Sequence, residues 1–129
     1  MPVYTVASRA PLNYETRQQA AKSITEIHCA VTGAPPEFVN IVFMEGHRIK
    51  EGKELGVIGT VRKGGNRNKE LTDSLRQQIH DGVAAATGLA RQQMATKLIG
   101  FPASWAMEGG EILPEPGEEG AWLKRSEVA

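Results

Sequence analysis

The sequence is poor in several features that would define a special class of protein. Its 129 residues include a single cysteine, Cys29, so an internal disulfide is excluded and we expect a protein of the reducing cytoplasm. Fifteen basic and fifteen acidic residues cancel, which leaves no overall field that would favour nucleic acid or an anionic membrane. We therefore expect neither of these two as a partner.

Long hydrophobic runs, a secretory signal and metal-ligand patterns are missing as well. No apolar stretch approaches the roughly 20 residues that cross a membrane, and the start lacks the charged and apolar blocks of a signal peptide. Three histidines and one cysteine show no metal-ligand spacing, and no phosphate loop or dinucleotide fingerprint is present. We expect a single domain over residues 1–129 with neither metal nor cofactor.

What is present is hydrophobic periodicity, which predicts a first strand–helix–strand unit over about residues 2–44. Residues 2–8 alternate in the manner of a strand. Residues 16–32 carry one helical stripe, with Asn13 or Thr16 as the N-cap and Gly33 as the C-cap. Residues 38–44 are an almost continuous apolar run, which is typical of a strand buried on both faces.

A second unit follows over about residues 54–100. It contains a predicted strand at 54–61, a helix at about 68–87 that ends at Gly88, and a strand at 93–99. The prolines and glycines of residues 101–129 predict a mostly irregular tail.

Two such units predict an α/β (α+β) fold in which a four-stranded sheet carries both helices on one face. Right-handed crossovers make the two strands of each unit parallel. The other face of the sheet then exposes apolar residues. We therefore expect self-association into a homo-oligomer that covers this face.

Pro2 is the first candidate for chemistry, because it directly follows Met1 at the start of the first strand. Removal of Met1 would leave a terminal secondary amine, and an α-amino group ordinarily has a pKa of about 7.7–8.0. Such a group exchanges protons near neutral pH, which makes Pro2 a candidate catalytic base. The alternative is that Pro2 only permits the removal of Met1.

His28 is the second candidate, because it lies at the edge of the first helix's apolar stripe. The helix runs back along the first strand, so His28 is expected beside the start of that strand. There it could donate a hydrogen bond to a substrate oxygen near neutral pH. The alternative is a structural histidine bonded to a nearby carbonyl.

Two arginines and one acid complete the set from the residues alone. Arg62 and Arg67 flank Gly64 and Gly65 in a basic loop, where they could grip a carboxylate or simply lie in a solvated turn. Glu108 follows apolar residues that can raise the pKa of an acid and let it exchange protons with water. The alternative is one solvated acid in an acidic tail.

The chain resembles the tautomerase superfamily, and within it the branch of cis-3-chloroacrylic acid dehalogenase. The resemblance covers nearly the whole chain. It is carried by Met-Pro-Val-Tyr at 1–4, Ala-Lys-Ser-Ile-Thr-Glu-Ile-His at 21–28, Phe-Pro-Ala-Ser-Trp-Ala-Met-Glu at 101–108 and Leu-Pro-Glu-Pro-Gly-Glu-Glu-Gly at 113–120.

The resemblance implies a homotrimer that acts, without a cofactor, on a small unsaturated or 2-oxo carboxylate. Pro2 would exchange a proton at the substrate carbon, and His28 and Arg62 would bind and polarise the carboxylate. Arg67 is the candidate for the family's second arginine, and Glu108 matches the carboxylate that activates water.

Two positions depart from the family pattern. The family's arginines have two residues between them, whereas four lie between Arg62 and Arg67, so whether Arg67 reaches the pocket stays open. Lys97 stands where the family has a tyrosine; a charged lysine cannot accept a hydrogen bond but can bind a second carboxylate. Hydration or dehalogenation, plain keto–enol tautomerisation and a non-catalytic oligomeric protein all remain open.

Overall fold

A computed structural model describes residues 2–46 and 49–128 of the chain, with side chains up to Leu123 in the last helix. Met1, whose removal the Pro2 hypothesis requires, lies outside these residues, as does Ala129 at the end of the predicted tail. Six main elements follow one another in the order β1 (Val3–Ser8), α1 (Tyr14–Thr32), β2 (Asn40–Glu45), β3 (Leu55–Lys63), α2 (Lys69–Thr87) and β4 (Met94–Pro102).

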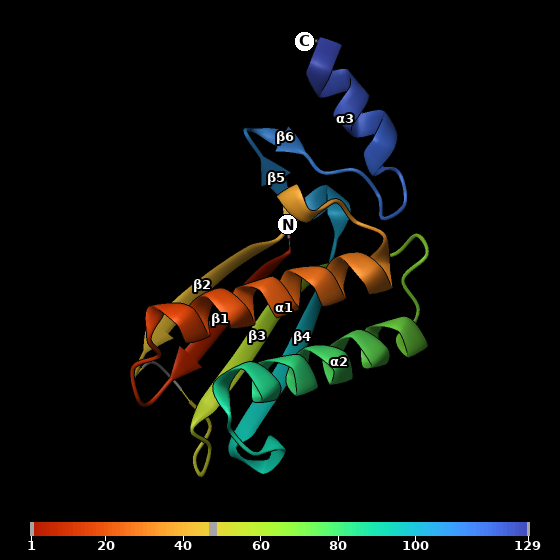
Figure 1. Cartoon of the computed structure of the whole chain (residues 1–129). Coiled ribbons are helices and arrows are strands. Elements are labelled where there is room, and N and C mark those ends of the chain that lie inside the picture. Colours follow the sequence, from red (N-terminus) through yellow and green to blue (C-terminus); the bar gives the residue numbers. More distant parts are fainter. Residues whose placement is uncertain (1, 47–48, 129) are drawn as a thin grey trace.

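The sheet has the strand order β2-β1-β3-β4, and both long helices cover one of its faces (Figure 1). β1 is parallel to β2, β3 is parallel to β4, and the two central strands β1 and β3 are antiparallel. The predicted fold of two β-α-β units in one sheet is thus confirmed.

The two helices begin and end with the same local chemistry. Asn13 accepts a hydrogen bond from the backbone N–H of Thr16, and Asn68 does the same for Leu71. Gly33 and Gly88 close the helices in the left-handed conformation, with φ of 78° and 77°. The helix ends are therefore set locally, in each β-α-β unit alike.

The core lies between the helices and the sheet. Its fully buried side chains come from both layers, and each large aliphatic one contributes about 1.5–3 kcal/mol through burial. The largest are Tyr4, Ile24, Leu55, Leu75, Ile79, His28, Val6, Val57 and Val83. Gly82 lets α2 approach α1 closely, because a Cβ at this position would lie 2.5 Å from Oγ of Ser23.

The strand predicted at residues 38–44 is not buried on both faces, which corrects that expectation. It forms β2 at the edge of the sheet, and Val42 is 50% exposed on the face that no helix covers. Ile58 and Ile99 of β3 and β4 are 45% and 44% exposed. The apolar run of β2 therefore reflects an uncovered sheet face, as the two-unit arrangement predicts.

The tail is more regular than expected. After β4, a short hairpin pairs β5 (Met107–Glu108) with β6 (Glu111–Ile112), and the chain ends in α3 (Glu119–Val128). The glycines that suggested irregular structure make the hairpin turn, because Gly109 and Gly110 both adopt positive φ, of 58° and 80°. No helix within the described residues is long and apolar enough to cross a membrane.

Candidate active site

Pro2 lies at the sheet end where β1 begins and β3 ends. It is buried, and its carbonyl oxygen accepts a hydrogen bond of 3.0 Å from the backbone N–H of Asn40. Because β3 is antiparallel to β1 and Thr60 pairs with Val3, the end of β3 that carries Arg62 lies beside Pro2. The sheet topology alone brings these two residues together.

His28 lies in the C-terminal half of α1 and is completely buried. Its Nδ1 is 2.7 Å from the hydroxyl oxygen of Tyr4, two residues after Pro2 in the chain, and the two rings meet edge to face. Its other ring nitrogen, Nε2, is buried without a hydrogen-bond partner among the described residues. Nδ1 of this imidazole is thus held by a residue of β1, and Nε2 makes no hydrogen bond within the described residues.

The surroundings of His28 keep its imidazole neutral. Burial, followed by the positive charges of Arg67 and Arg62, lowers the pKa of His28 from 6.5 to about 3. Burial also raises the pKa of the Tyr4 hydroxyl above its ordinary value, which keeps the phenol protonated. Both rings are therefore neutral at physiological pH.

Arg67 folds back over the end of β3 despite its longer spacing from Arg62. Its Nη1 donates a hydrogen bond of 3.1 Å to the carbonyl oxygen of Arg62, and its backbone N–H bonds to Gly64. Burial and the nearby Arg62 lower the pKa of Arg67, and its Nε is buried without a partner among the described residues. The loop is thus a tight turn that returns a second guanidinium to this end of the sheet.

The tail binds Arg62 itself. This side chain is almost wholly buried, its Nη2 lies 2.6 Å from Oε1 of Glu119, and its Nη1 donates to the carbonyl oxygen of Pro114. The second carboxylate oxygen of Glu119 accepts a hydrogen bond from the backbone N–H of Gly117. Arg62 therefore joins the end of β3 to the start of α3.

Glu108 lies on the hairpin strand β5, opposite Glu111, and is partly buried. The hairpin is fixed at its base, where the backbone N–H of Leu113 bonds to the carbonyl oxygen of Ala106. The next residue, Pro114, is the one that Arg62 holds. The position of Glu108 is thus linked to Arg62 through the tail backbone.

Lys97 is not brought to this group of residues within one chain. It is exposed on β4 and pairs with Ile58, which in turn pairs with Thr5, three residues along β1 from Pro2. Its neighbour Thr96 faces α2, where its hydroxyl lies 2.8 Å from Nδ1 of His80. Since strand residues alternate, Lys97 points to the uncovered face of the sheet.

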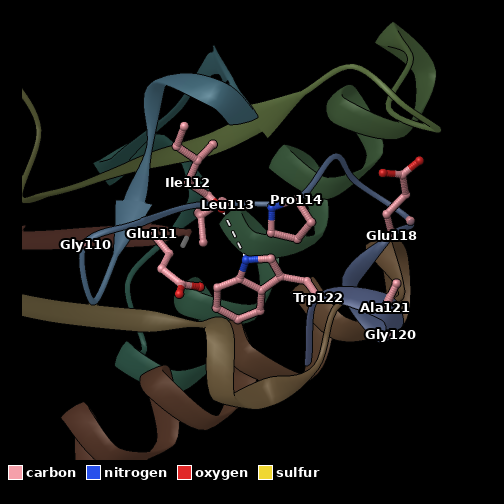
Figure 2. Close-up of a pocket in the computed structure, with 10 residues that line it drawn as sticks. Gly110, Glu111, Ile112, Leu113, Pro114, Glu118, Gly120, Ala121 and Trp122 are labelled. Atoms are coloured by element: carbon pink, nitrogen blue, oxygen red, sulfur yellow. Dashed lines mark hydrogen bonds between the residues drawn. The ribbon is translucent and has the colours of Figure 1, made fainter. Parts of the chain in front are cut away.

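A broad hollow of about 930 Å³ lies under the tail, and only tail residues line it (Figure 2). Trp122 forms one wall; its indole nitrogen donates to the carbonyl oxygen of Ile112, and its ring packs edge to face on Phe38. Neither Pro2 nor His28 lines this hollow, so the hollow is not the site of these two residues. Within the described part of the chain, no group of three acids, histidines or cysteines could hold a metal.

Two residues of this site were missed by sequence reasoning, Tyr4 and Glu119. Tyr4 occupies an inward position of the first strand, and the alternation of that strand indicates its burial but not its bond to His28. Glu119 is one of two adjacent tail acids, and no sequence signal separates it from the exposed Glu118.

Comparison with protein-family models and with curated proteins found no match to the sequence. Solved structures do match. N1, a member of the cis-3-chloroacrylic acid dehalogenase family, is 27% identical with a TM-score of 0.83, over 95% of this chain and 90% of its own. The native protein Ps01740 is 30% identical with a TM-score of 0.68, over 82% of this chain and 99% of its own.

A third similar structure shows the fold alone. It is a fused 4-OT solved as an asymmetric trimer, which is 18% identical with a TM-score of 0.71 over 85% of this chain and 94% of its own. The shared fold extends over 82–95% of this chain in these three structures. The chain belongs to the tautomerase superfamily, and a member of the cis-3-chloroacrylic acid dehalogenase family is among the structures it resembles.

Proposed function

We propose that this protein is an enzyme in which the terminal amine of Pro2 transfers a proton at a carbon atom of a small unsaturated or 2-oxo carboxylate. The observation that carries the proposal is a pair of buried nitrogen atoms without hydrogen-bond partners in the described structure, Nε2 of His28 and Nε of Arg67. A buried polar group left without a hydrogen bond costs about 1–3 kcal/mol. An anion bound between these groups would remove that cost.

The two nitrogen atoms belong to one electrostatic environment. The charge of Arg67 acts to lower the pKa of His28 and also that of Tyr4, so this charge lies close to both rings. A neutral imidazole and a cationic guanidinium together suit a carboxylate, because both can donate to its oxygens. We assign the substrate carboxylate to His28 and Arg67, with Arg62 adding positive charge while it holds the tail.

Pro2 is the group assigned to the reacting carbon. Once Met1 is removed, its secondary amine takes a proton from the α-carbon and returns it to the carbonyl oxygen while the double bond moves from C=O to C=C, or does the reverse, which interconverts keto and enol forms. The carboxylate bound beside the strand start would hold the substrate in reach of this amine. No residue beyond Pro2 is needed for the proton transfer itself.

Addition of water is the further step that Glu108 would allow. A carboxylate that removes a proton from water supports hydration of a double bond, and loss of halide follows where the substrate carries a halogen. The position of Glu108 on a hairpin tied to Arg62 supports this role. A plain tautomerase, in which Glu108 is idle, is the second candidate.

The assembly that we propose is a homotrimer of single-domain subunits in the cytoplasm. The uncovered face carries Val42, Ile58 and Ile99, and a fused 4-OT with the same fold forms a trimer. Association of subunits through this face would remove its apolar groups from water. Lys97 lies on the same face, so we assign it to contact with a neighbouring subunit, where it can serve that subunit's substrate.

The test is a substrate panel with the wild type and Glu108→Gln. Ketonisation of phenylpyruvate enol and chloride release from cis-3-chloroacrylate are followed separately, and the N-terminal mass is measured on the same preparation. Loss of chloride release with retained ketonisation would support the water-activating role of Glu108. Activity of the wild type on the enol alone would leave the plain tautomerase, and retention of Met1 would reject the Pro2 mechanism.

A further inference from the structure

The bond between Tyr4 and His28 determines which ring nitrogen of His28 carries its proton. A neutral imidazole has one N–H donor and one acceptor, and its tautomer follows from the partner at each nitrogen. Nδ1 faces the Tyr4 hydroxyl at 2.7 Å, and Nε2 has no partner among the described residues. The question is which of the two groups donates in the Tyr4–His28 bond.

In the bond between Tyr4 and His28, the donor is the hydroxyl of Tyr4. Its hydroxyl is buried, and Nδ1 of His28 is the acceptor that the described structure offers to it. Were Nδ1 to donate instead, the buried phenolic hydrogen would be left without an acceptor, at a cost of about 1–3 kcal/mol. With Tyr4 donating, Nδ1 is the acceptor and the imidazole proton resides on Nε2.

The ring of Tyr4 is held in place for this bond by the neighbouring strand. Gly59 pairs with Tyr4 in the sheet, and a Cβ on Gly59 would lie 2.5 Å from Cε1 of the Tyr4 ring. The Tyr4 phenol therefore fills the space that a side chain at position 59 would occupy. Leu98 of β4 closes the same space, since its Cδ2 would lie 2.8 Å from that Cβ.

We propose that Tyr4 is a positioning residue that holds His28 as a neutral imidazole with its proton on Nε2, so that the imidazole is a hydrogen-bond donor toward the anion site shared with Arg67. The opposite tautomer would present a lone pair, which repels a carboxylate oxygen. The effect on substrate binding rests on the proposed function. The tautomer itself does not, because it is a property of the free protein.

The first measurement is the long-range proton–nitrogen spectrum of the full chain, labelled with nitrogen-15 in its histidines and without substrate. We expect His28 to show an acceptor-type resonance for Nδ1 and a protonated, pyrrole-type resonance for Nε2. The reverse assignment overturns the proposal whatever the protein's activity. The expected assignment in a protein without activity would reject the proposed function and leave the role of Tyr4 standing.

Tyr4→Phe supplies the second measurement, with Tyr14→Phe as the matched control. Tyr14 is the other tyrosine of the chain and is 69% exposed at the start of α1. In Tyr4→Phe we expect both tautomers of His28 to be populated and KM for the carboxylate substrate to rise about fivefold to tenfold, the effect of one neutral hydrogen bond. In Tyr14→Phe neither should change. A single unchanged tautomer in Tyr4→Phe overturns the proposal.

Should Tyr4→Phe fail to fold, 3-fluorotyrosine at both tyrosine positions replaces it. The fluorine makes the phenol a stronger donor without removing the ring or the hydroxyl. A shift of the His28 Nδ1 resonance supports donation by Tyr4. An unshifted resonance overturns it.

Discussion

Arg62 and Glu119 form a buried ion pair between the end of β3 and the start of α3, with Nη2 2.6 Å from Oε1. The pair joins residues 57 positions apart in the chain. A second bond from the same guanidinium, to the carbonyl oxygen of Pro114, holds the backbone between the hairpin and α3. An arginine that the family resemblance assigns to substrate binding therefore also fastens the tail to the sheet.

Removal of Glu119 tests the ion pair. Glu119→Ala leaves the Arg62 charge buried and unpaired, which typically costs about 3–5 kcal/mol, and we expect a loss of about 3 kcal/mol in urea unfolding. Glu118→Ala is the control, because this neighbouring acid is exposed, and it should change stability by less than about 0.5 kcal/mol. Equal effects of the two variants would show that the pair contributes nothing specific.

Arg67 is expected to act on substrate binding rather than on proton transfer. Arg67→Gln removes a charged donor, worth about 1.5–3 kcal/mol, so KM for a carboxylate substrate should rise about 10- to 100-fold with kcat little changed. Lys63→Gln is the matched control, since Lys63 is an exposed cation at the other side of the same turn. Steady-state kinetics of the wild type, Arg67→Gln and Lys63→Gln measure this effect. An unchanged KM in Arg67→Gln would show that Arg67 does not bind the substrate.

His28 should make the folded state sensitive to acid. Its pKa is about 3 in the fold against an ordinary 6.5, so between these values the unfolded chain binds a proton that the folded chain, with Tyr4, Arg62 and Arg67 around the ring, does not. Stability attributable to His28 is therefore full above pH 6.5 and falls, by about 1.4 kcal/mol per pH unit, as the pH decreases toward 3.

The measurement is urea unfolding of the wild type and His28→Gln from pH 7 to pH 4. The carboxyl groups titrate in both proteins, so the difference between the two curves isolates His28. We expect the wild type to lose stability more steeply. Parallel curves would mean that His28 accepts a proton in the folded state as readily as in the unfolded one.

Gly59 and Gly56 offer a matched pair within β3. A Cβ at Gly59 would lie 2.5 Å from the Tyr4 ring, whereas the nearest atom to a Cβ at Gly56 is 3.9 Å away. Gly59→Ala should therefore destabilise the fold by about 1–3 kcal/mol through overpacking, and Gly56→Ala should not. Thermal unfolding of both variants checks this, and a neutral Gly59→Ala would show that the phenol has room to move.

The uncovered sheet face should control assembly. Ile58→Glu places a charge in the middle of the proposed subunit interface, where an unpaired buried charge is strongly unfavourable, so the trimer should dissociate. Tyr14→Glu is the control, because Tyr14 is exposed at the start of α1. Light scattering after gel filtration measures the masses. A monomeric wild type, or a trimer that survives Ile58→Glu, would contradict the proposal.

Much of the fold could be predicted because its signals are local. Helix ends are marked by capping residues that form hydrogen bonds with the nearest backbone groups, such as Asn68, Gly33 and Gly88. The tail was harder, because the same glycine types can end regular structure or form a hairpin turn, as Gly109 and Gly110 do. The helix α3, which follows this hairpin, has no strong apolar stripe, so no local pattern of the sequence predicted it.

The burial of β2 was predicted incorrectly for a different reason. An apolar run such as residues 38–44 indicates that a surface will be removed from water, but not whether the same chain or another copy removes it. Val42 is exposed because the two helices cover only one sheet face. Which molecule covers this face depends on how the helices and strands are arranged in space, and the periodicity of the sequence does not show it.

The sequence by itself determined the two β-α-β units, the helix ends and the candidate residues Pro2, His28 and Arg62. Only the tertiary structure decided that Tyr4 binds His28 and that Glu119 binds Arg62, across separations of 24 and 57 residues. The physical reason is that periodicity and capping act within a few residues of the chain. Hydrogen bonds between buried polar groups depend on how strands pair and helices pack, which places distant residues within 3 Å of each other.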